Sequence, residues 1–155
     1  MIRQGRLIFQ VDVWSNLRPI IMPLWERHNL EVASLSDQKL FAPDWDKFDN
    51  LAATGNDHWV SARDGGALVG YAFALVSTHL HRKNTLCAFW DLYYLVPELR
   101  VGMNGYNLLK FFESSLWQRG VRKQYTGTKK WMDVGSIFER RGWTEVERLF
   151  TKSLD

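Results

Sequence analysis

A segment in the second half of the chain combines the residue types that a phosphate-binding loop needs. An apolar run ends at Val96, Pro97 follows, and Gly102 and Gly105 come before a stretch with helical spacing. The first amides of a helix have no intrahelical acceptor, and the helix dipole adds partial positive charge there. Glycines let the backbone approach an anion, and Arg100 supplies a guanidinium for a phosphate oxygen. This pattern predicts an anion site, with a plain strand-to-helix connection as the alternative.

One carboxylate lies inside the apolar strand that precedes this loop. Asp91 alternates with Phe89, Tyr93 and Leu95, so we expect these four side chains on one strand face. Burial raises the pKa of a carboxyl group, and a raised pKa suits a base that takes a proton from an attacking amine. The alternative is a structural acid paired with an arginine or a backbone amide. Glu98 is a second candidate base, with a capping or solvent-facing role as its alternative.

The remaining reactive side chains favour structural roles. His79 and His81 would share a face in an extended chain, but no cysteine or acid cluster joins them, so we expect a surface loop and no metal. His58 could line an acceptor pocket or simply pack at a strand end. Cys87 is the only cysteine and lies in an apolar run, which favours a buried thiol and suits a reducing cytoplasm.

The elements that position these residues follow from periodicity and from breaker residues. We expect strands at 6–13, 58–62, 67–77, 85–96, 121–126 and 143–154, and helices at 15–25, 43–51, 103–119 and 131–141. Pro23 is expected to kink or break the first helix, and Gly65 and Gly66 indicate a hairpin turn. The order β-α-α-β-β-β-α-β-α-β predicts an α/β (α+β) fold with a mixed sheet and helices on both faces.

Bulk composition narrows the class of protein. The 155 residues suit one domain spanning 1–155, and 46% hydrophobic content argues against disorder. The 14% aromatic content predicts a core built on large rings, with a stacking surface as the alternative. A net charge of +3 mildly favours anionic partners such as nucleic acid or a phosphate-bearing cofactor. We see no apolar run of ~18 residues and no export signal, so we expect no membrane segment and a cytoplasmic location.

The stretch after the fourth expected strand resembles motif A of the GNAT acetyltransferase superfamily. Pro97, Glu98 and Arg100 match its Pro-acid-x-Arg run, and Gly105 matches the last small position of its loop. Leu108 and Leu109 match the helix that follows. Met103 stands where the middle glycine is expected, and Gly102, one residue earlier, could take over part of that role. The resemblance implies a mostly antiparallel GNAT-like sheet.

The C-terminal part is similar to the same family. Residues 137–143 resemble the Leu-Tyr-Glu-Lys-x-Gly-Phe end of its last helix, and residues 145–152 resemble its last strand. The resemblance covers about residues 58–155. In the N-terminal third, only the order of the expected strands and helices matches the family. The resemblance is closer to the small GNAT proteins often encoded by bacteriophages than to the histone-acting enzymes.

The resemblance implies acetyl-CoA as the donor substrate. The pantetheine arm would bond to backbone near Leu95 and Val96, and an amide near Leu95 would polarise the thioester carbonyl. The pyrophosphate would lie on the amides of Val101, Gly102, Met103, Asn104, Gly105 and Tyr106.

The family often carries a tyrosine in its last helix that protonates the leaving thiolate, and this sequence has Phe138 there. A phenyl ring cannot donate a proton. Tyr125 is a candidate substitute, together with Tyr106, Tyr94 and Tyr93.

We therefore expect an N-acetyltransferase that acts on a primary amine of a small molecule or a protein. Met103 and Phe138 support an alternative, a GNAT-like binding or inhibitory protein with little turnover. A third hypothesis is an acyltransferase acting on nucleic acid or a modified nucleobase, favoured by the basic balance and the aromatic surplus. The aromatic N-terminal third could supply a homodimer surface, and a phage-encoded protein would work in the host cytoplasm.

Overall fold

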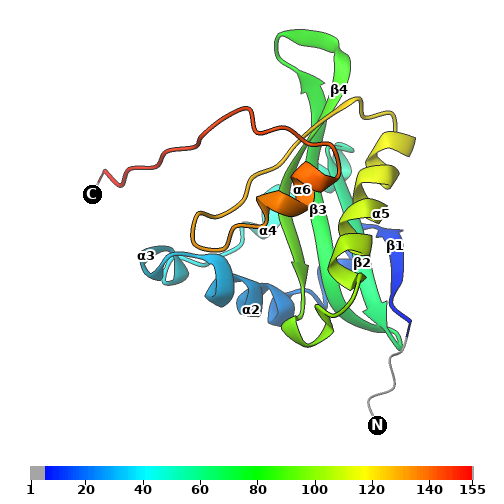
Figure 1. The fold of residues 1–155 in the computed structure, drawn as a ribbon, viewed down its shortest axis with the longest axis vertical. Coiled ribbons are helices and arrows are strands. Elements are labelled where there is room, and N and C mark those ends of the chain that lie inside the picture. Colours follow the sequence, from blue (N-terminus) through cyan, green and yellow to red (C-terminus); the bar gives the residue numbers. More distant parts are fainter. Residues whose placement is uncertain (1–5, 155) are drawn as a thin grey trace.

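A computed structural model describes residues 6–154 and shows a five-stranded sheet. The strands are β1 (Ile8–Asp12), β2 (Asp57–Asp64), β3 (Ala67–His79), β4 (Arg82–Leu95) and β5 (Lys123–Tyr125), and their order in the sheet is β1-β2-β3-β4-β5. Strands β1 to β4 pair antiparallel, and β5 pairs parallel to β4 (Figure 1). The hairpin turn between β2 and β3 is confirmed, with φ of 55° at Gly65 and 85° at Gly66.

Helices cover both faces of this sheet, as predicted. The helices are α1 (Trp14–Leu17), α2 (Met22–Val32), α3 (Leu35–Gln38), α4 (Trp45–Ala53), α5 (Asn104–Gln118) and α6 (Gly135–Arg140), with a 3-10 turn, η1 (Pro97–Leu99). Side chains of α1, α2 and α4 build one core, and those of α5 and α6 build the other. None of the helices in residues 6–154 combines the length and hydropathy that crossing a bilayer requires.

The aromatic surplus forms the core between the sheet and the N-terminal helices. The Trp59 ring lies 5.2 Å from that of Trp14 and 4.4 Å from that of Phe73, measured between centroids. The indole N–H of Trp14 donates to Asp49 Oδ1 at 2.7 Å, which ties α1 to α4. Stacked rings bury large areas, so this core stabilises a region with few long helices.

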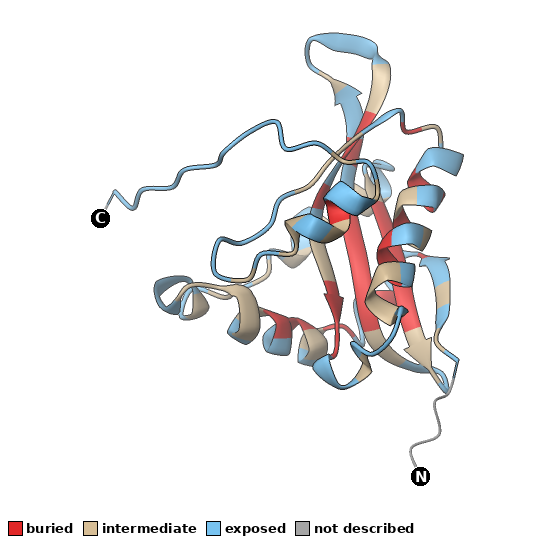
Figure 2. Cartoon of the chain, viewed as in Figure 1, coloured by how far each residue is buried: buried red, intermediate tan, exposed pale blue. Residues whose placement is uncertain are grey.

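The opposite core lies between α5 and small residues of the sheet. Phe112 and Leu116 are fully buried and cluster with Ala72 and Ala74 of β3. Figure 2 shows the strands beneath α5 in the buried colour. Alanines leave room for a helix to pack close to the sheet, so α5 lies directly on it.

The first predicted helix is in fact two helices, because two prolines interrupt it. Helix α1 ends before Pro19, and Pro23 is the second residue of α2. A proline in the first turn loses no intrahelical hydrogen bond, because its missing N–H would have no partner there.

The closing strand predicted at 143–154 is wrong: residues 143–154 contain no strand. The chain leaves α6 and runs away from the sheet (Figure 1). Apolar alternation gives a segment strand propensity, but a strand forms only beside an edge that supplies hydrogen-bond partners. The helix predicted at 131–141 is shorter, Gly135–Arg140.

Candidate functional site

Strand β4 contains a bulge at the residue that sequence reasoning selected as a base. Phe73 of β3 pairs with Leu92, whereas the next residue, Ala74, pairs with Trp90, so Asp91 is the extra residue. A bulge bends its strand and breaks the regular ladder. The sequence gives no sign of this bulge, because apolar and polar residues alternate through Asp91 as they would in a regular strand.

The bulge interrupts the alternation that was used to predict the face of Asp91. Trp90, Tyr93 and Leu95 all pack in the core under α5, so Trp90 and Tyr93 share a face although they are three positions apart. The two-residue alternation of a strand does not run through a bulge. The face that Asp91 was expected to share with Phe89, Tyr93 and Leu95 therefore stays a prediction.

The two parallel strands, β4 and β5, separate just before the bulge. Strands β4 and β5 pair only over Cys87–Phe89 and Lys123–Tyr125. Beyond Phe89, the β4 edge has no strand beside it among residues 6–154. Two side-chain bonds brace the gap: Trp90 Nε1 donates to Gln124 Oε1 at 2.9 Å, and the Tyr93 hydroxyl donates to the Gly127 carbonyl at 2.7 Å.

Backbone alternation decides which groups of β4 face this gap. The amide of Val96 donates to the Val69 carbonyl at 2.9 Å, toward β3. In an antiparallel ladder the neighbouring residue points its N–H and C=O the opposite way, so those of Leu95 point into the gap. The Leu95 carbonyl accepts from Arg100 Nε at 2.7 Å. The Leu95 amide is the donor that this arrangement offers to a ligand, whereas the Val96 amide is occupied.

The loop that joins β4 to α5 presents backbone amides. Gly102 has a φ of 56°, in the left-handed region, and carries much of the turn. The Asn104 amide donates to the Val101 carbonyl at 3.2 Å and the Asn107 amide to the Met103 carbonyl at 2.8 Å. Within residues 6–154, the amides of Gly105 and Tyr106 have no acceptor. These two N–H groups sit at the positive end of α5, where an anion is favoured.

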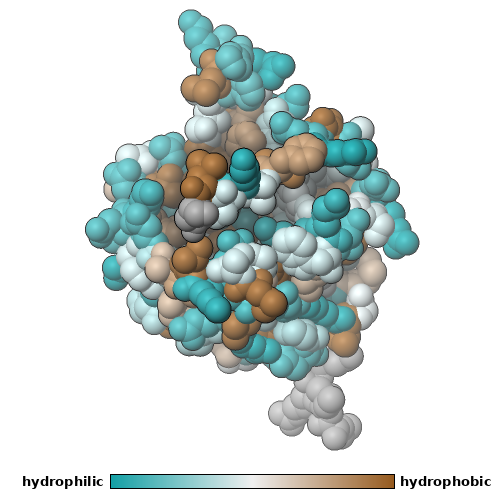
Figure 3. All heavy atoms as spheres, turned by 90° about the vertical axis from the view of Figure 1, so that its left-hand side faces the viewer, coloured by the Kyte–Doolittle hydropathy of each residue, from teal (hydrophilic) through white to brown (hydrophobic). Residues whose placement is uncertain are grey.

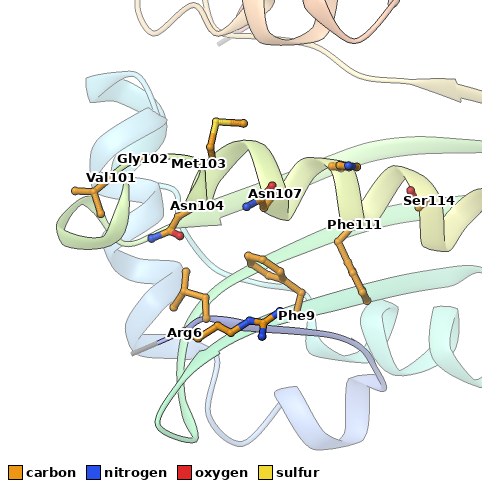
Figure 4. A pocket seen from close by; sticks show the side chains of 11 residues that line it. Arg6, Phe9, Val101, Gly102, Met103, Asn104, Asn107, Phe111 and Ser114 are labelled. Atoms are coloured by element: carbon orange, nitrogen blue, oxygen red, sulfur yellow. The ribbon is translucent and has the colours of Figure 1, made fainter. Parts of the chain in front are cut away.

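Met103 does not obstruct the loop. Its side chain is 57% exposed and points away from Arg6 and Phe9 (Figure 4). A groove of about 650 Å³ lies between the β1 end of the chain and α5. This groove shares residues 101–104 with the loop between β4 and α5, and it lies on the β1 side of α5. The gap between β4 and β5 lies on the other side of the sheet order, beside β5. The groove is lined by Arg6, Leu7, Phe9, Val101, Gly102, Met103, Asn104, Asn107, Lys110, Phe111 and Ser114.

Arg100 is held by helix α2. Its guanidinium forms a two-pronged ion pair with Glu31, with Nη2 2.8 Å from Oε2, and lies 5.3 Å from the centre of the Tyr94 ring. The hydrogen bonds between them lower the pKa of Glu31 and raise that of Arg100. A phosphate contact by Arg100 therefore stays a prediction that requires Glu31 to share this guanidinium. Sequence reasoning missed Glu31, because its partner is 69 positions away.

Asp91 lies at an exposed position on the open side of β4. Loss of hydration to the surrounding protein raises the pKa of its carboxyl group, and the charge of Lys129 acts in the opposite direction. Lys129 lies over the Trp131 ring at 5.7 Å, and the Trp131 indole donates to the Val32 carbonyl at 3.1 Å. The loop after β5 thus reaches the end of α2 and brings a cation toward the bulge. A carboxyl group with a raised pKa, next to the open edge of a strand, is suited to act as a general base.

Two of the candidate proton donors, Tyr93 and Tyr94, are already committed, and a third, Tyr106, accepts a hydrogen bond. Burial raises the pKa of Tyr93 to about 12, and its hydroxyl donates to Gly127. The Tyr94 hydroxyl bonds to Glu31, and that of Tyr106 accepts from Arg141 at 3.0 Å.

Tyr125 differs from these three tyrosines. Its ring stacks on Phe89 at 4.7 Å, and its hydroxyl makes no hydrogen bond to residues 6–154. Phe138 is buried between Trp90 and Trp143, which excludes it from proton transfer. Tyr106 keeps its own proton as well but is held by Arg141, whereas Tyr125 lies at the point where β4 and β5 separate.

Comparison with known proteins shows the fold. No family model matches the sequence, and no curated protein does. A solved aminoglycoside acetyltransferase from an uncultured soil metagenomic sample, in complex with sisomicin, has a TM-score of 0.73 at 16% identity, covering 96% of this chain and 97% of that one. A predicted acetyltransferase from Clostridium acetobutylicum, solved with acetyl-CoA, has a TM-score of 0.66 at 13% identity, covering 96% of both chains.

A third solved structure is a ribosomal-protein-alanine N-acetyltransferase from Brucella melitensis biovar Abortus 2308, with a TM-score of 0.63 at 12% identity, covering 96% of this chain and 98% of that one. The predicted fold class, a mostly antiparallel mixed sheet flanked by helices as in GNAT acetyltransferases, is confirmed.

Proposed function

We propose that this chain is an acyl-CoA-dependent N-acyltransferase of the GNAT superfamily, with acetyl-CoA as donor and a primary amine as acceptor. One observation carries the proposal: the edge of β4 that is open beyond Phe89, next to the bulge at Asp91, leads to a helix start whose Gly105 and Tyr106 amides lack acceptors within residues 6–154. Binding acetyl-CoA requires a hydrogen-bond donor to the thioester carbonyl and further donors to the diphosphate. The edge of β4 offers the first, and the start of α5 offers the others a few residues later in the chain. The solved neighbours support this reading, since one of them holds acetyl-CoA.

In this proposal, the diphosphate lies on the loop from Val101 to Tyr106, with Gly102 giving it the necessary turn. The pantetheine arm lies along the β4 edge up to Leu95 and Val96. Because the Val96 amide already bonds to Val69, the Leu95 amide is the donor for the thioester oxygen. One such donor to a developing oxyanion typically contributes about 2.7–4 kcal/mol to transition-state stabilisation.

The reaction balances with two side chains and water. An amine that arrives protonated first loses one proton to solvent. The neutral nitrogen attacks the thioester carbon, Asp91 takes the second proton from this nitrogen, and the carbon–sulfur bond then breaks. The departing thiolate takes a proton from Tyr125, whose hydroxyl is uncommitted, and the proton on Asp91 returns through water to the Tyr125 phenolate, which restores both groups. The raised pKa of Asp91 makes its carboxylate a stronger base for the nitrogen proton.

A binding protein with little turnover is the second candidate, and two observations favour it. Phe138 fills the place of a family acid, and Arg100 is paired with Glu31 instead of pointing freely at the loop. This candidate predicts the same coenzyme binding without the chemistry.

Calorimetry with acetyl-CoA, followed by thiol release with a panel of amines, separates the two candidates. We expect micromolar binding and release of CoA that depends on the amine. Binding without release on any amine supports the second candidate, and absence of binding contradicts both. The panel should contain aminoglycosides and peptide amines, because solved neighbours are named for such acceptors.

Nucleic acid is a further acceptor class to test, since the tip of the β3–β4 hairpin exposes Arg82 and Lys83. A salt-dependent mobility shift with oligonucleotides would support this class. The cytoplasmic location and the closer similarity to phage-encoded members belong to the same proposal.

A further inference from the structure

Positive charge gathers at one end of the molecule. The β3–β4 hairpin projects past the end of α5 (Figure 1), and its tip carries Arg82 and Lys83. Arg119 directly follows α5, and Arg122 and Lys123 lie where β5 begins. All five side chains are at exposed positions. We call these five residues the basic end.

The hairpin and β5 bring their cations close together. Strand β5 pairs with β4 from Lys123 onward, opposite Cys87, where the projecting part of the hairpin begins. The pKa of His79 in this hairpin is lowered, first by loss of hydration and then by the charges of Arg82, His81 and Lys123. The cations of the two elements therefore act on one place.

No carboxylate within the neighbouring segments neutralises the basic end. Residues 79–86 and 114–126 contain no aspartate or glutamate. Within residues 6–154, none of the five cations forms an ion pair. Asp57 comes near, since its backbone carbonyl accepts a hydrogen bond from Arg119. The five cations and this one acid carry a charge of +4, whereas the whole chain carries +3, so the basic end favours an anionic partner.

An exposed aromatic ring accompanies these cations. Trp117 is 64% exposed in the last turn of α5, and the guanidinium of Arg122 lies 5.7 Å from the centre of its ring. Arg122 Nη1 also donates to the Trp117 carbonyl at 3.4 Å, which keeps the pair together. Proteins that bind single-stranded nucleic acid combine cations that follow the phosphates with rings on which bases stack. A duplex hides the faces of its bases and would use only the charges.

The shape of this end favours a strand over a flat surface. Leu80 is 95% exposed at the tip of the hairpin, whereas Trp117 lies on α5, which ends short of that tip (Figure 1). A membrane surface would need both apolar side chains at one level. Figure 3 shows hydrophilic side chains over the projecting tip, around a small hydrophobic group.

We propose that the basic end binds single-stranded nucleic acid, with the cations of the hairpin and of β5 on the phosphates and Trp117 against a base. Arg82 precedes Asp91 by nine positions along β4, which at roughly 3.3 Å per residue is about 30 Å. The partner is therefore held away from the gap between β4 and β5. Its binding does not depend on the proposed acetyl transfer.

Fluorescence anisotropy of a labelled single strand of about 20 nucleotides, measured without acetyl-CoA, tests this surface. We expect micromolar binding at about 50 mM salt. The logarithm of the association constant should fall against the logarithm of salt with a slope of about −3, since each of about four phosphate contacts contributes about −0.7. The triple variant Arg82→Gln, Lys83→Gln, Lys123→Gln should bind roughly 10²-fold more weakly, with a slope near −1.

A second triple variant is the matched control. Lys39→Gln, Arg140→Gln, Lys152→Gln removes the same charge from exposed positions on other elements. This variant should keep the affinity and the salt slope of the wild type. Urea unfolding shows whether both variants stay folded.

Trp117→Ala separates a single strand from a duplex. This variant should bind the single strand roughly 5- to 100-fold more weakly with an unchanged salt slope, because it loses a stacked base. It should bind a duplex of the same length as the wild type does. A duplex that binds as tightly as the single strand, together with no effect of Trp117→Ala, overturns the proposal.

Three further outcomes also overturn it. One is a wild type that binds no single strand at about 50 mM salt. Another is a control variant that loses as much affinity as the variant of the basic end. The third is a wild type that binds vesicles of phosphatidylserine and phosphatidylcholine and no oligonucleotide.

Discussion

Replacing Gly102 by valine should weaken acetyl-CoA binding through backbone strain alone. Gly102 has a φ of 56°, and a Cβ added there would meet no atom within 4 Å. The substitution therefore introduces no clash, and its cost is that of placing an L-residue in the left-handed region, about 1–2 kcal/mol. A β-branched residue is especially disfavoured there, so we expect the loop to relax to another conformation.

If the loop must return to its present shape to bind a diphosphate, that cost appears in the affinity. At 1.4 kcal/mol per factor of ten, the dissociation constant for acetyl-CoA should rise by roughly 5- to 30-fold. Calorimetry measures the affinity, and urea unfolding without ligand measures the stability of each variant.

Gly120→Val is the matched control. Gly120 has a φ of 104° just beyond the other end of α5, and an added Cβ there also meets nothing within 4 Å. This variant should lose at least as much stability and keep the wild-type affinity. If Gly102→Val bound acetyl-CoA as tightly as the wild type, the loop conformation would not be what holds the donor, and the reasoning would be refuted.

Three further substitutions test other parts of the account. Asp91→Asn should lower kcat roughly 10²- to 10⁴-fold. In the wild type, activity should fall as the pH drops through the raised pKa of Asp91, and this acidic limb of the pH profile should be absent in the variant. Glu98→Gln is the control and should change little. Burial acts to raise the pKa of Asp12, but hydrogen bonds from Arg63 and other donors lower it from 3.8 to about 2. The ionised Asp12 carboxylate therefore stabilises the fold above about pH 4, and this contribution is lost as the pH falls toward 2. Asp12→Asn should lower the free energy of unfolding by about 2 kcal/mol at pH 7. The free energy measured by urea unfolding should then fall less steeply between about pH 4 and pH 2 than it does in the wild type. Phe138→Tyr should destabilise by about 1–3 kcal/mol without raising kcat, because its hydroxyl would enter an apolar core; a large gain in kcat would show that a missing acid limits the reaction.

Local chemistry made several features predictable from the sequence. A proline is tolerated in the first turn of a helix and not in its interior, so the break before Pro23 could be foreseen. Gly102 carries the left-handed turn of the loop, as the displaced glycine suggested. The aromatic residues are mainly core, because rings of this size are most stable when buried against one another.

Features that depend on distant partners could not be foreseen. The bulge at Asp91 is defined by its pairing with Phe73 and Ala74, and nothing in the residue types of β4 marks it. Arg100 looked free for phosphate because Glu31 lies on a helix far away in the sequence. The final strand was predicted from its residue pattern and from the family resemblance, but within residues 6–154 this segment pairs with no other strand.

Titration of the nitrogen-15-labelled protein with acetyl-CoA, followed through backbone amide resonances, tests the central claim most directly. We predict that the largest shifts occur at Gly102, Gly105 and Tyr106, and at Leu95 on the edge of β4. Saturating acetyl-CoA that leaves these four amides unmoved, or that shifts the groove residues Phe9 and Phe111 in their place, would contradict the account.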